Sequence, residues 1–293
     1  MDRGAALTVH KIPLERRTLH GHFSRDLEPV ASVEPGDAVA FGCLNAGWRI
    51  TDEERFEPFD EELDAGHALI GPVEVRGARA GASLVVHVDE VVPAAWGVTF
   101  GHETKVLWTY EREAGTWVDD HGRRVAAAPF LGVLGMPPPE SGRHSTIPPR
   151  RSGGNIDCKE LVAGSTLYLP IPVDGALFSA GDGHGTQADG EASGTAIECP
   201  LERAQLTLEL SELELRSPVA RIPGAWLAFG FHEDLDLAAE EAMATILDLM
   251  ERELGLERSY ALALSSLVVD LRVTQIVNGA KGVHAVLRDD AIR

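Results

Sequence analysis

One glycine-rich stretch, residues 152–200, contains most of the side chains in this chain that could perform chemistry. Its acids and its single histidine are spread among glycines, and those of interest are Asp157, Asp182, His184, Asp189, Glu191 and Glu198. Glycine lets a backbone turn tightly and lets neighbouring segments approach closely. The stretch is therefore suited to a site at which carboxylates and an imidazole converge.

The spacing of these residues sorts them into pairs. Asp182 and His184 are two residues apart, as are Asp189 and Glu191. Side chains two apart on a strand face the same way, and a turn through residues 185–188 would fold one pair towards the other. Carboxylates gathered in a small volume repel each other unless a cation or shared protons compensate. A divalent metal with histidine and carboxylate ligands would resolve this conflict, acidify a water and polarise a carbonyl. Glu191 would then pass the proton of that water to a leaving amine.

Two other interpretations of the stretch stay open. Turns favour Asp and Gly, so an ordinary acidic β-turn is also compatible with the sequence. The run DCKE at residues 157–160 supplies a different chemistry, because it holds the nucleophile, carboxylate and lysine of a cysteine amidase centred on Cys158. Adjacent residues on a strand point to opposite faces, however, and a nucleophile needs its base within hydrogen-bonding reach. His67, further upstream, either lines a cleft or lies in a plain loop.

The elements expected to position these residues are mostly strands. Leu84, Val86 and Val88 alternate with residues of the other face, and this period of two predicts a half-buried strand. Similar runs bounded by Gly and Pro predict further strands within residues 29–49, 71–92, 106–110, 116–118, 129–135, 166–171, 176–179, 195–198 and 205–215. Helical spacing predicts a helix over residues 236–254, with Asp234 or Asp236 as N-cap and Gly255 as its end. A second helix at 260–270 and a returning strand are expected after it.

These elements predict a mainly β fold that resembles a β-sandwich of the jelly-roll or CUB-like kind. A smaller α/β element is expected in the C-terminal third. The Pro-rich segment 137–149 suggests a division into a β-rich lobe, residues 1–150, and a second lobe, residues 151–293, that carries the acidic motif and the helices. The alternative is one intertwined domain.

Composition limits the classes of partner. The formal net charge is -20, which disfavours nucleic acids and anionic membrane surfaces. The sequence has no apolar run of the roughly 18 residues that a membrane helix needs, and its N-terminus lacks the apolar core of a signal peptide. Three scattered cysteines do not form a disulfide framework. A cytoplasmic protein with reduced thiols is expected.

Several segments together resemble the acetamidase/formamidase family. The central one runs GGNIDCKELVAGSTLYLPIPVDGALFSAGDGHGTQADGEASGTAIECP, and the others are HGHFSRDLEPVASVEPGDAV at 20–39, GPVEVRGARAGASLVVHVDEV at 71–91 and PFLGVLG at 129–135. The resemblance implies hydrolysis of small aliphatic amides to a carboxylate and ammonia. It also implies a β-rich sandwich, metal binding and a homo-oligomer.

The resemblance also implies roles for individual residues. The expected ligands of a divalent metal, zinc in the first place and calcium as the alternative, are His20, Asp157, Asp182 and His184. Glu191 and Asp189 are the expected catalytic acids, and Asn155 and Gln187 are the expected substrate-binding residues. Ala188 departs from the family pattern, which has Gly in QGDGE. Two alternatives to this function remain, a metal-free amidase that uses Cys158 and a non-catalytic relative that binds a metal or another ligand.

Overall fold

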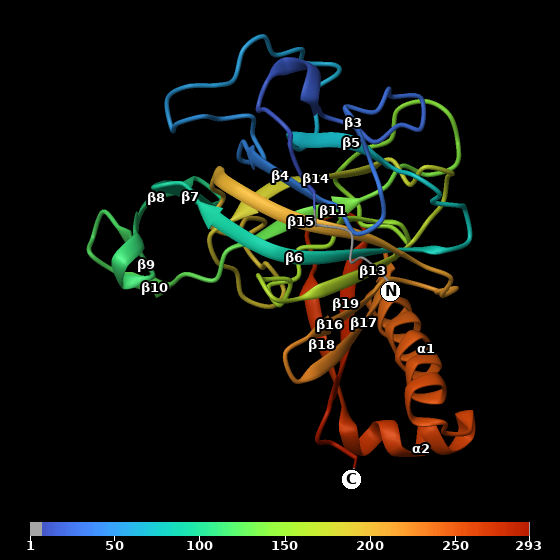
Figure 1. The fold of residues 1–293 in the computed structure, drawn as a ribbon. Helices are drawn as coiled ribbons and strands as arrows, with labels where there is room; N and C mark the ends of the chain where they lie inside the picture. Colours follow the sequence, from blue (N-terminus) through green and yellow to red (C-terminus); the bar gives the residue numbers. More distant parts are fainter. Residues whose placement is uncertain (1–7, 293) are drawn as a thin grey trace.

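Strands dominate the computed structural model, which describes residues 8–292 (Figure 1). The first seven residues, part of the N-terminus in which no signal peptide is expected, lie outside the described residues. Within that range the largest sheet has nine strands, in the order β1 (Val9–Lys11), β4 (Ala38–Cys43), β15 (Leu201–Ser211), β6 (Ser83–Pro93), β13 (Thr166–Pro170), β16 (Val219–Ile222), β17 (Ala225–His232), β19 (Lys281–Arg288) and β18 (Val269–Gln275).

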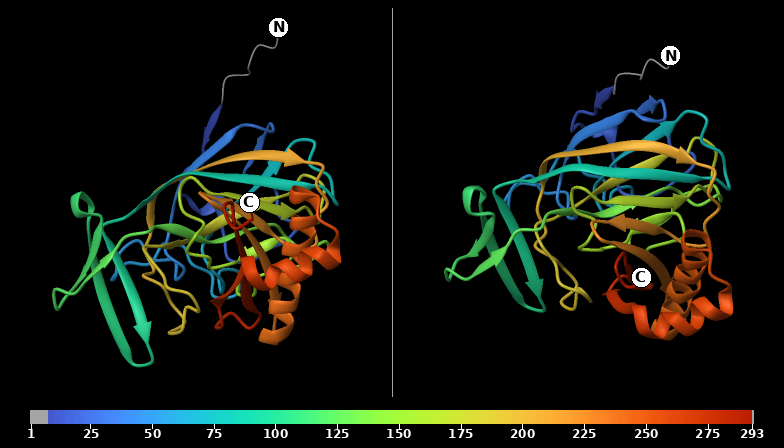
Figure 2. Two further views of the ribbon diagram at one scale, coloured as in Figure 1. Left: turned by 90° about the horizontal axis from the view of Figure 1, so that it is seen from below. Right: turned by 60° about the horizontal axis from the view of Figure 1, so that its bottom comes forward.

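A second sheet lies against the first. Its strands are β12 (Gly153–Asn155), β11 (Phe130–Gly135), β14 (Phe178–His184), β5 (Leu69–Val75) and β2 (Leu19–His20), and β3 (Ala31–Val33) also pairs with β5. A small third sheet projects from the body in both views of Figure 2 and contains β10 (Arg124–Ala126), β9 (Thr116–Asp119), β8 (Thr104–Glu111) and β7 (Trp96–Gly101). Two short 3₁₀ turns, Arg16–Thr18 and Arg112–Ala114, complete the strand-rich part.

One apolar core joins the two large sheets. Phe41, Leu84 and Leu206 come from the nine-stranded sheet, and Ile70 and Leu134 come from the second sheet; all five are buried in the same cluster. Burial of side chains from two facing sheets is the arrangement of a β-sandwich. The predicted mainly β, sandwich-like fold is therefore confirmed.

The C-terminal third adds the expected helical element. Helix α1 (Leu235–Leu254) begins at Asp234, whose carboxylate accepts the amides of the first turn, and ends at Gly255 in the left-handed conformation. Helix α2 (Arg258–Val268) follows, and β18 returns the chain to the sheet. Helix α1 packs on β17 and β19 and forms a second apolar core with them. The helix approaches so closely that a β-carbon on Gly230 would lie 2.1 Å from a helix carbonyl oxygen.

The sheets interleave the two halves of the sequence. In the nine-stranded sheet β15 lies between β4 and β6, and in the second sheet β14 lies between β11 and β5. The division predicted near residue 150 stays a prediction, and strands from both sides of that residue alternate in both sheets. One predicted strand is wrong, because residues 195–198 form only isolated bridges, from Glu198 to Val98 and to His184. Among the described residues, no helix is long and apolar enough to cross a membrane.

Candidate active site

Two side chains of strand β14 form the centre of a buried polar cluster. Asp182 and His184 both point into it, as their two-residue spacing predicts, and both are buried. Gly181 and Gly183 alternate with them, and a β-carbon on either would lie 2.4 Å from a backbone oxygen of a neighbouring segment. The glycines therefore let other segments press against the strand, while the aspartate and the histidine face the cluster.

Gln187 determines which ring nitrogen of His184 faces the cluster. The side-chain Nε2 of Gln187 donates to the backbone oxygen of Asp157 at 2.8 Å, so its Oε1 is left to accept from Nδ1 of His184 at 3.0 Å. Nδ1 therefore carries a proton, and Nε2 is the atom that faces the carboxylates. If Nε2 is unprotonated, it is a hydrogen-bond acceptor that faces carboxylate oxygens, which are also acceptors. A proton or a cation must therefore lie between them.

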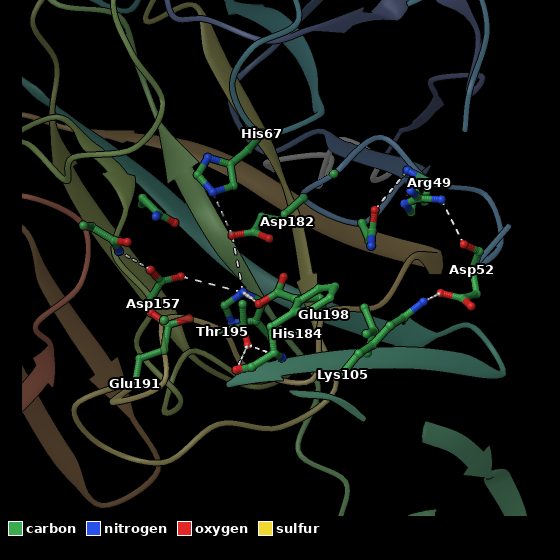
Figure 3. Close-up of a pocket in the computed structure, with 18 of the residues that line it drawn as sticks. Arg49, Asp52, His67, Lys105, Asp157, Asp182, His184, Glu191, Thr195 and Glu198 are labelled. Atoms are coloured by element: carbon green, nitrogen blue, oxygen red, sulfur yellow. Dashed lines mark hydrogen bonds and ion pairs between the residues drawn. The ribbon is translucent and has the colours of Figure 1, made fainter. Parts of the chain in front are cut away.

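Four carboxylates surround this imidazole (Figure 3). Nε2 of His184 lies 3.3 Å from Oδ2 of Asp182, 3.5 Å from Oε1 of Glu198 and 3.9 Å from Oδ1 of Asp157. Glu191 adds the fourth, and one of its oxygens lies within 4.8 Å of donor atoms of Asp157 and His184. Buried like charges at these separations are unfavourable unless protons or a cation neutralise them.

Three of these carboxylates stand on strained backbone. The φ angle is +51° at Asp157, +61° at Asp182 and +44° at Glu191, which is the left-handed region that residues other than glycine rarely adopt. Each such conformation costs on the order of 1–3 kcal/mol and persists where the surrounding structure enforces it, often at functional sites. This strain favours a functional site over an ordinary acidic turn.

Burial and crowding shift the pKa values of the cluster. Burial raises the pKa of Glu191 to about 7 and the pKa of Glu198 to about 8. Burial, together with the charge of Glu191, raises the pKa of Asp157 well above its usual value. Burial alone would lower the pKa of His184, but the carboxylates of Glu198 and Asp182 raise it well above 6.5. In the absence of a cation, the cluster is therefore expected to retain extra protons.

The cluster has the features of a site for a divalent metal ion. Within residues 8–292, Oδ1 of Asp157, Oδ1 of Asp182 and Oε2 of Glu198 are buried without a hydrogen-bond partner, although such groups are normally paired or bound to metal. Gly132 on β11 faces the same space, and a β-carbon there would lie 2.5 Å from Oδ2 of Asp182 and 2.6 Å from Oδ1 of Asp157. The space between the carboxylates thus exists because residue 132 has no side chain.

Beyond the cluster the site opens into a cavity of about 410 Å³. His67 lines this cavity, and its Nε2 lies 4.0 Å from Oδ2 of Asp182. On the side away from the cluster in Figure 3, Arg49 donates to the backbone oxygen of Asp52 and Lys105 pairs with the carboxylate of Asp52. The cavity therefore has an acidic inner end and basic side chains across from it.

The structure brings only part of the predicted site together. Asn155 lines the cavity, and its buried Oδ1 has no hydrogen-bond partner in the described part of the chain. Gln187 uses both ends of its amide to orient His184 and Asp157, as described above. Asp189 points away to the surface, where it pairs with Lys159 at 2.9 Å.

His20 also lies outside the cluster. Its Nδ1 donates to the backbone oxygen of His22 at 2.7 Å, and its Nε2 is 3.0 Å from the hydroxyl of Ser179. Both ring nitrogens are thus used within the fold, and burial lowers the pKa of this imidazole to about 4. These contacts are those of a histidine with a structural role.

Cys158 is placed where a nucleophile cannot meet a substrate of this cavity. Its side chain is fully buried, and the residue is not part of the cavity lining. Burial and the neighbouring Glu160 raise the pKa of the thiol well above its usual value, which disfavours the thiolate. The geometry therefore gives no support to the cysteine-based alternative.

Comparison with known proteins agrees with this architecture. A profile of the Acetamidase/Formamidase family matches residues 8–141 and 139–212. The chain belongs to this family.

Individual members of the family are similar to this chain in sequence and in fold. A formamidase of Methylophilus methylotrophus is 27% identical, and the match covers 63% of this chain and 63% of the formamidase. The chain thus spans less than two thirds of the length of that relative. The crystal structure of an acetamidase from Bacillus halodurans is 27% identical, with a TM-score of 0.84 over 94% of this chain and 97% of that chain. An acetamidase from Yersinia enterocolitica, 21% identical, has the same fold, with a TM-score of 0.86 over 99% and 95% of the two chains.

Sequence reasoning gave no role to Glu198, and it missed Asn278, which lies outside the family match. Its Nδ2 donates to Oδ2 of Asp157, and its turn between β18 and β19 is held by Oε1 of Gln275, which accepts two amides of that turn. Asn278 sits 121 residues after Asp157, so no local motif connects them. Only the return of the C-terminal sheet to the site brings the two side chains together.

Proposed function

We propose that the chain is an amidohydrolase that converts small aliphatic amides and water to a carboxylate and ammonia. Family membership supports this reaction class, and the relatives named above include a formamidase and acetamidases. The observation that supports it most directly is the cluster of four buried carboxylates around Nε2 of His184, in contact with a cavity. The proposal includes a divalent metal as cofactor.

Asp182, His184 and Glu198 are the proposed metal ligands. Their donor atoms lie within 4.8 Å of one another, and the spare oxygens of both carboxylates lack partners within the described range. A set of one imidazole and two carboxylates suits zinc, while calcium would need more oxygen ligands, which Asp157 and Glu191 could supply. A divalent cation bound here would supply Lewis acidity, which polarises a carbonyl and lowers the pKa of water.

Glu191 is proposed to move the proton. It takes a proton from the attacking water as the C–O bond forms and gives it to the amide nitrogen as the C–N bond breaks. Without a metal, burial raises the pKa of Glu191 to about 7, towards the range in which a group can both accept and release a proton near neutral pH. Asp157, beside it, stays in place through the amide of Asn278 and through its own backbone amide, which donates to the carbonyl of Gly132.

Asn155 is proposed to orient the substrate. It lies on β12 at the cavity wall, and its Oδ1 is a buried acceptor without a partner within residues 8–292. A primary amide carries two N–H donors, so one of them can satisfy this oxygen and fix the direction of the scissile bond. The bound substrate thus supplies the donor that Oδ1 of Asn155 lacks in the free site.

The function is tested by ammonia release from formamide, acetamide and propionamide, and by ring opening of a γ-lactam to its amino acid, each with and without a chelator. We expect the protein as isolated to release ammonia from at least one linear amide, and the chelated protein to recover activity only when metal is restored. Bound metal without any amide turnover would instead support a non-catalytic binding protein. Activity that survives chelation but not thiol alkylation would contradict the metal-dependent proposal.

Asn278→Ala should lower kcat for the best amide, or the affinity for the metal, by about 10- to 100-fold, the range for residues that orient metal-site groups. The loss follows because Oδ2 of Asp157 loses its donor. Ile276→Ala is the matched control, because this side chain on the same turn is exposed. We would measure kcat, KM and metal content for both variants. An Asn278→Ala enzyme within twofold of wild type in all three would contradict the positioning role.

A further inference from the structure

A second group of metal-binding residue types lies apart from the cavity. Cys158, Glu160 and His284 each offer one donor atom, and these three atoms lie within 4.8 Å of one another. Cys158 and Glu160 belong to the turn that follows Asp157, whereas His284 lies in the middle of β19. The cysteine and the histidine side chains are completely buried, so the group forms an internal contact between the turn and the large sheet.

One ring nitrogen of His284 lacks a hydrogen-bond partner in this group. Its Nδ1 is 2.8 Å from the hydroxyl of Thr274, and its buried Nε2 has no hydrogen-bond partner within residues 8–292. The nearest carboxylate oxygen, Oε2 of Glu160, is 3.8 Å away, beyond hydrogen-bonding distance. A polar atom left unpaired in the interior is unfavourable, so a ligand between these two atoms is favoured.

The distances suit a small cation. Sγ of Cys158 lies 3.2 Å from Oε2 of Glu160, and Nε2 of His284 lies 3.8 Å from the same oxygen. Zinc bonds of about 2.0–2.3 Å in tetrahedral geometry separate neighbouring ligand atoms by roughly 3.3–3.7 Å. Arg272 holds the other oxygen of Glu160 at 3.1 Å, which leaves Oε2 directed at the group. Small shifts of side chains therefore suffice to bind a cation.

The chemical types of the three donor atoms determine which cations the group can bind. A thiolate, an imidazole nitrogen and a carboxylate oxygen are ligands of zinc and related transition metals, whereas calcium and magnesium prefer oxygen throughout. Binding would displace the thiol proton of Cys158 to solvent, since the thiolate is the form that binds metal. Three protein donors leave one tetrahedral position for a water.

We propose that Cys158, Glu160 and His284 form a second, structural site for a zinc-class divalent cation. The site links β19 to the turn that begins next to Asp157, so the bound cation would stabilise the backbone that presents this carboxylate to the cavity. The proposal is independent of the amidase activity, because none of the three residues lines the cavity. The same cation site could therefore exist in a relative without catalytic activity.

Cobalt(II) added to the chelated full-length protein tests the site. Among residues 8–292, the donor groups of the cavity cluster contain no sulfur, so a thiolate-to-cobalt charge-transfer band in the near ultraviolet reports on Cys158. We expect this band in wild type and in His184→Gln, and its loss in Cys158→Ser, with one fewer cobalt bound per chain. His284→Gln should weaken cobalt binding at this site at least tenfold.

Cys199→Ser is the matched control, because Cys199 is equally buried but lies outside the three groups of possible donors in the described residues. This variant should keep the band. A wild-type protein that binds cobalt without any thiolate band would overturn the proposal even if the cysteine variants failed to fold. A band that persists in Cys158→Ser would also overturn it.

Discussion

Glu191→Gln should lower kcat for amide hydrolysis by about 10² to 10⁴-fold, the usual contribution of a general acid–base group. Glutamine keeps the size of the side chain and one carbonyl oxygen, but it cannot accept a proton from water and return it to nitrogen. Because Asp182, His184 and Glu198 form a donor group without Glu191, the metal content of the variant should stay close to that of wild type. The measurements are steady-state ammonia release and metal content of the same preparation.

Asp189→Asn is the informative comparison for this variant. Asp189 lies two residues before Glu191, and the sequence predicted that the two act together. The carboxylate of Asp189 is nevertheless at the surface, where it pairs with Lys159. Breaking one exposed ion pair changes stability by less than about 1 kcal/mol, so we expect kcat to change by less than about threefold. Normal turnover in Glu191→Gln, or equal losses in both variants, would contradict the assignment of proton transfer to Glu191.

The difference between these two acids shows what spacing predicts and what it does not. Asp182 and His184 lie on β14, where a period of two holds, and they do meet. Asp189 and Glu191 have the same spacing but follow the end of that strand, and the left-handed φ of Glu191 turns it inward. Spacing is therefore reliable within a strand and loses its meaning as soon as the backbone leaves it.

The sequence also predicted the β-sandwich and helix α1, because alternation, turn residues and caps are local signals. It did not predict the pairing of Asn278 with Asp157, and it left open whether His67 lines a cleft or lies in a loop, since both depend on contacts between distant segments. His20 is the opposite case, and its role as a metal ligand stays a prediction. Its family motif suggested a ligand, but hydrogen bonds to both ring nitrogens keep it in the fold. A motif identifies residue types, and only the tertiary contacts show which atoms remain free.

Gly132→Ala should abolish metal binding at the cavity cluster and lower kcat at least as much as Glu191→Gln. The three nearest atoms to an added β-carbon all belong to the cluster: Oδ2 of Asp182 at 2.5 Å, Oδ1 of Asp157 at 2.6 Å and Cε1 of His184 at 3.0 Å. A methyl group here must push these side chains apart, and it occupies the space between the carboxylates. Off-rotamer side chains and small backbone shifts of this kind cost about 1–3 kcal/mol.

Gly101→Ala provides the matched control, since it is also a strand glycine but has open space where the β-carbon would go. It should leave metal content, kcat and the midpoint of thermal unfolding near wild-type values. For Gly132→Ala, the stabilisation that metal gives to wild type against heat should disappear, because a site that binds no metal gains nothing from mass action. If Gly132→Ala instead binds metal and turns over amide like wild type, the space beside Gly132 is not the metal site. The empty volume that glycine provides would then serve only to relieve the crowding of Asp157 and Asp182.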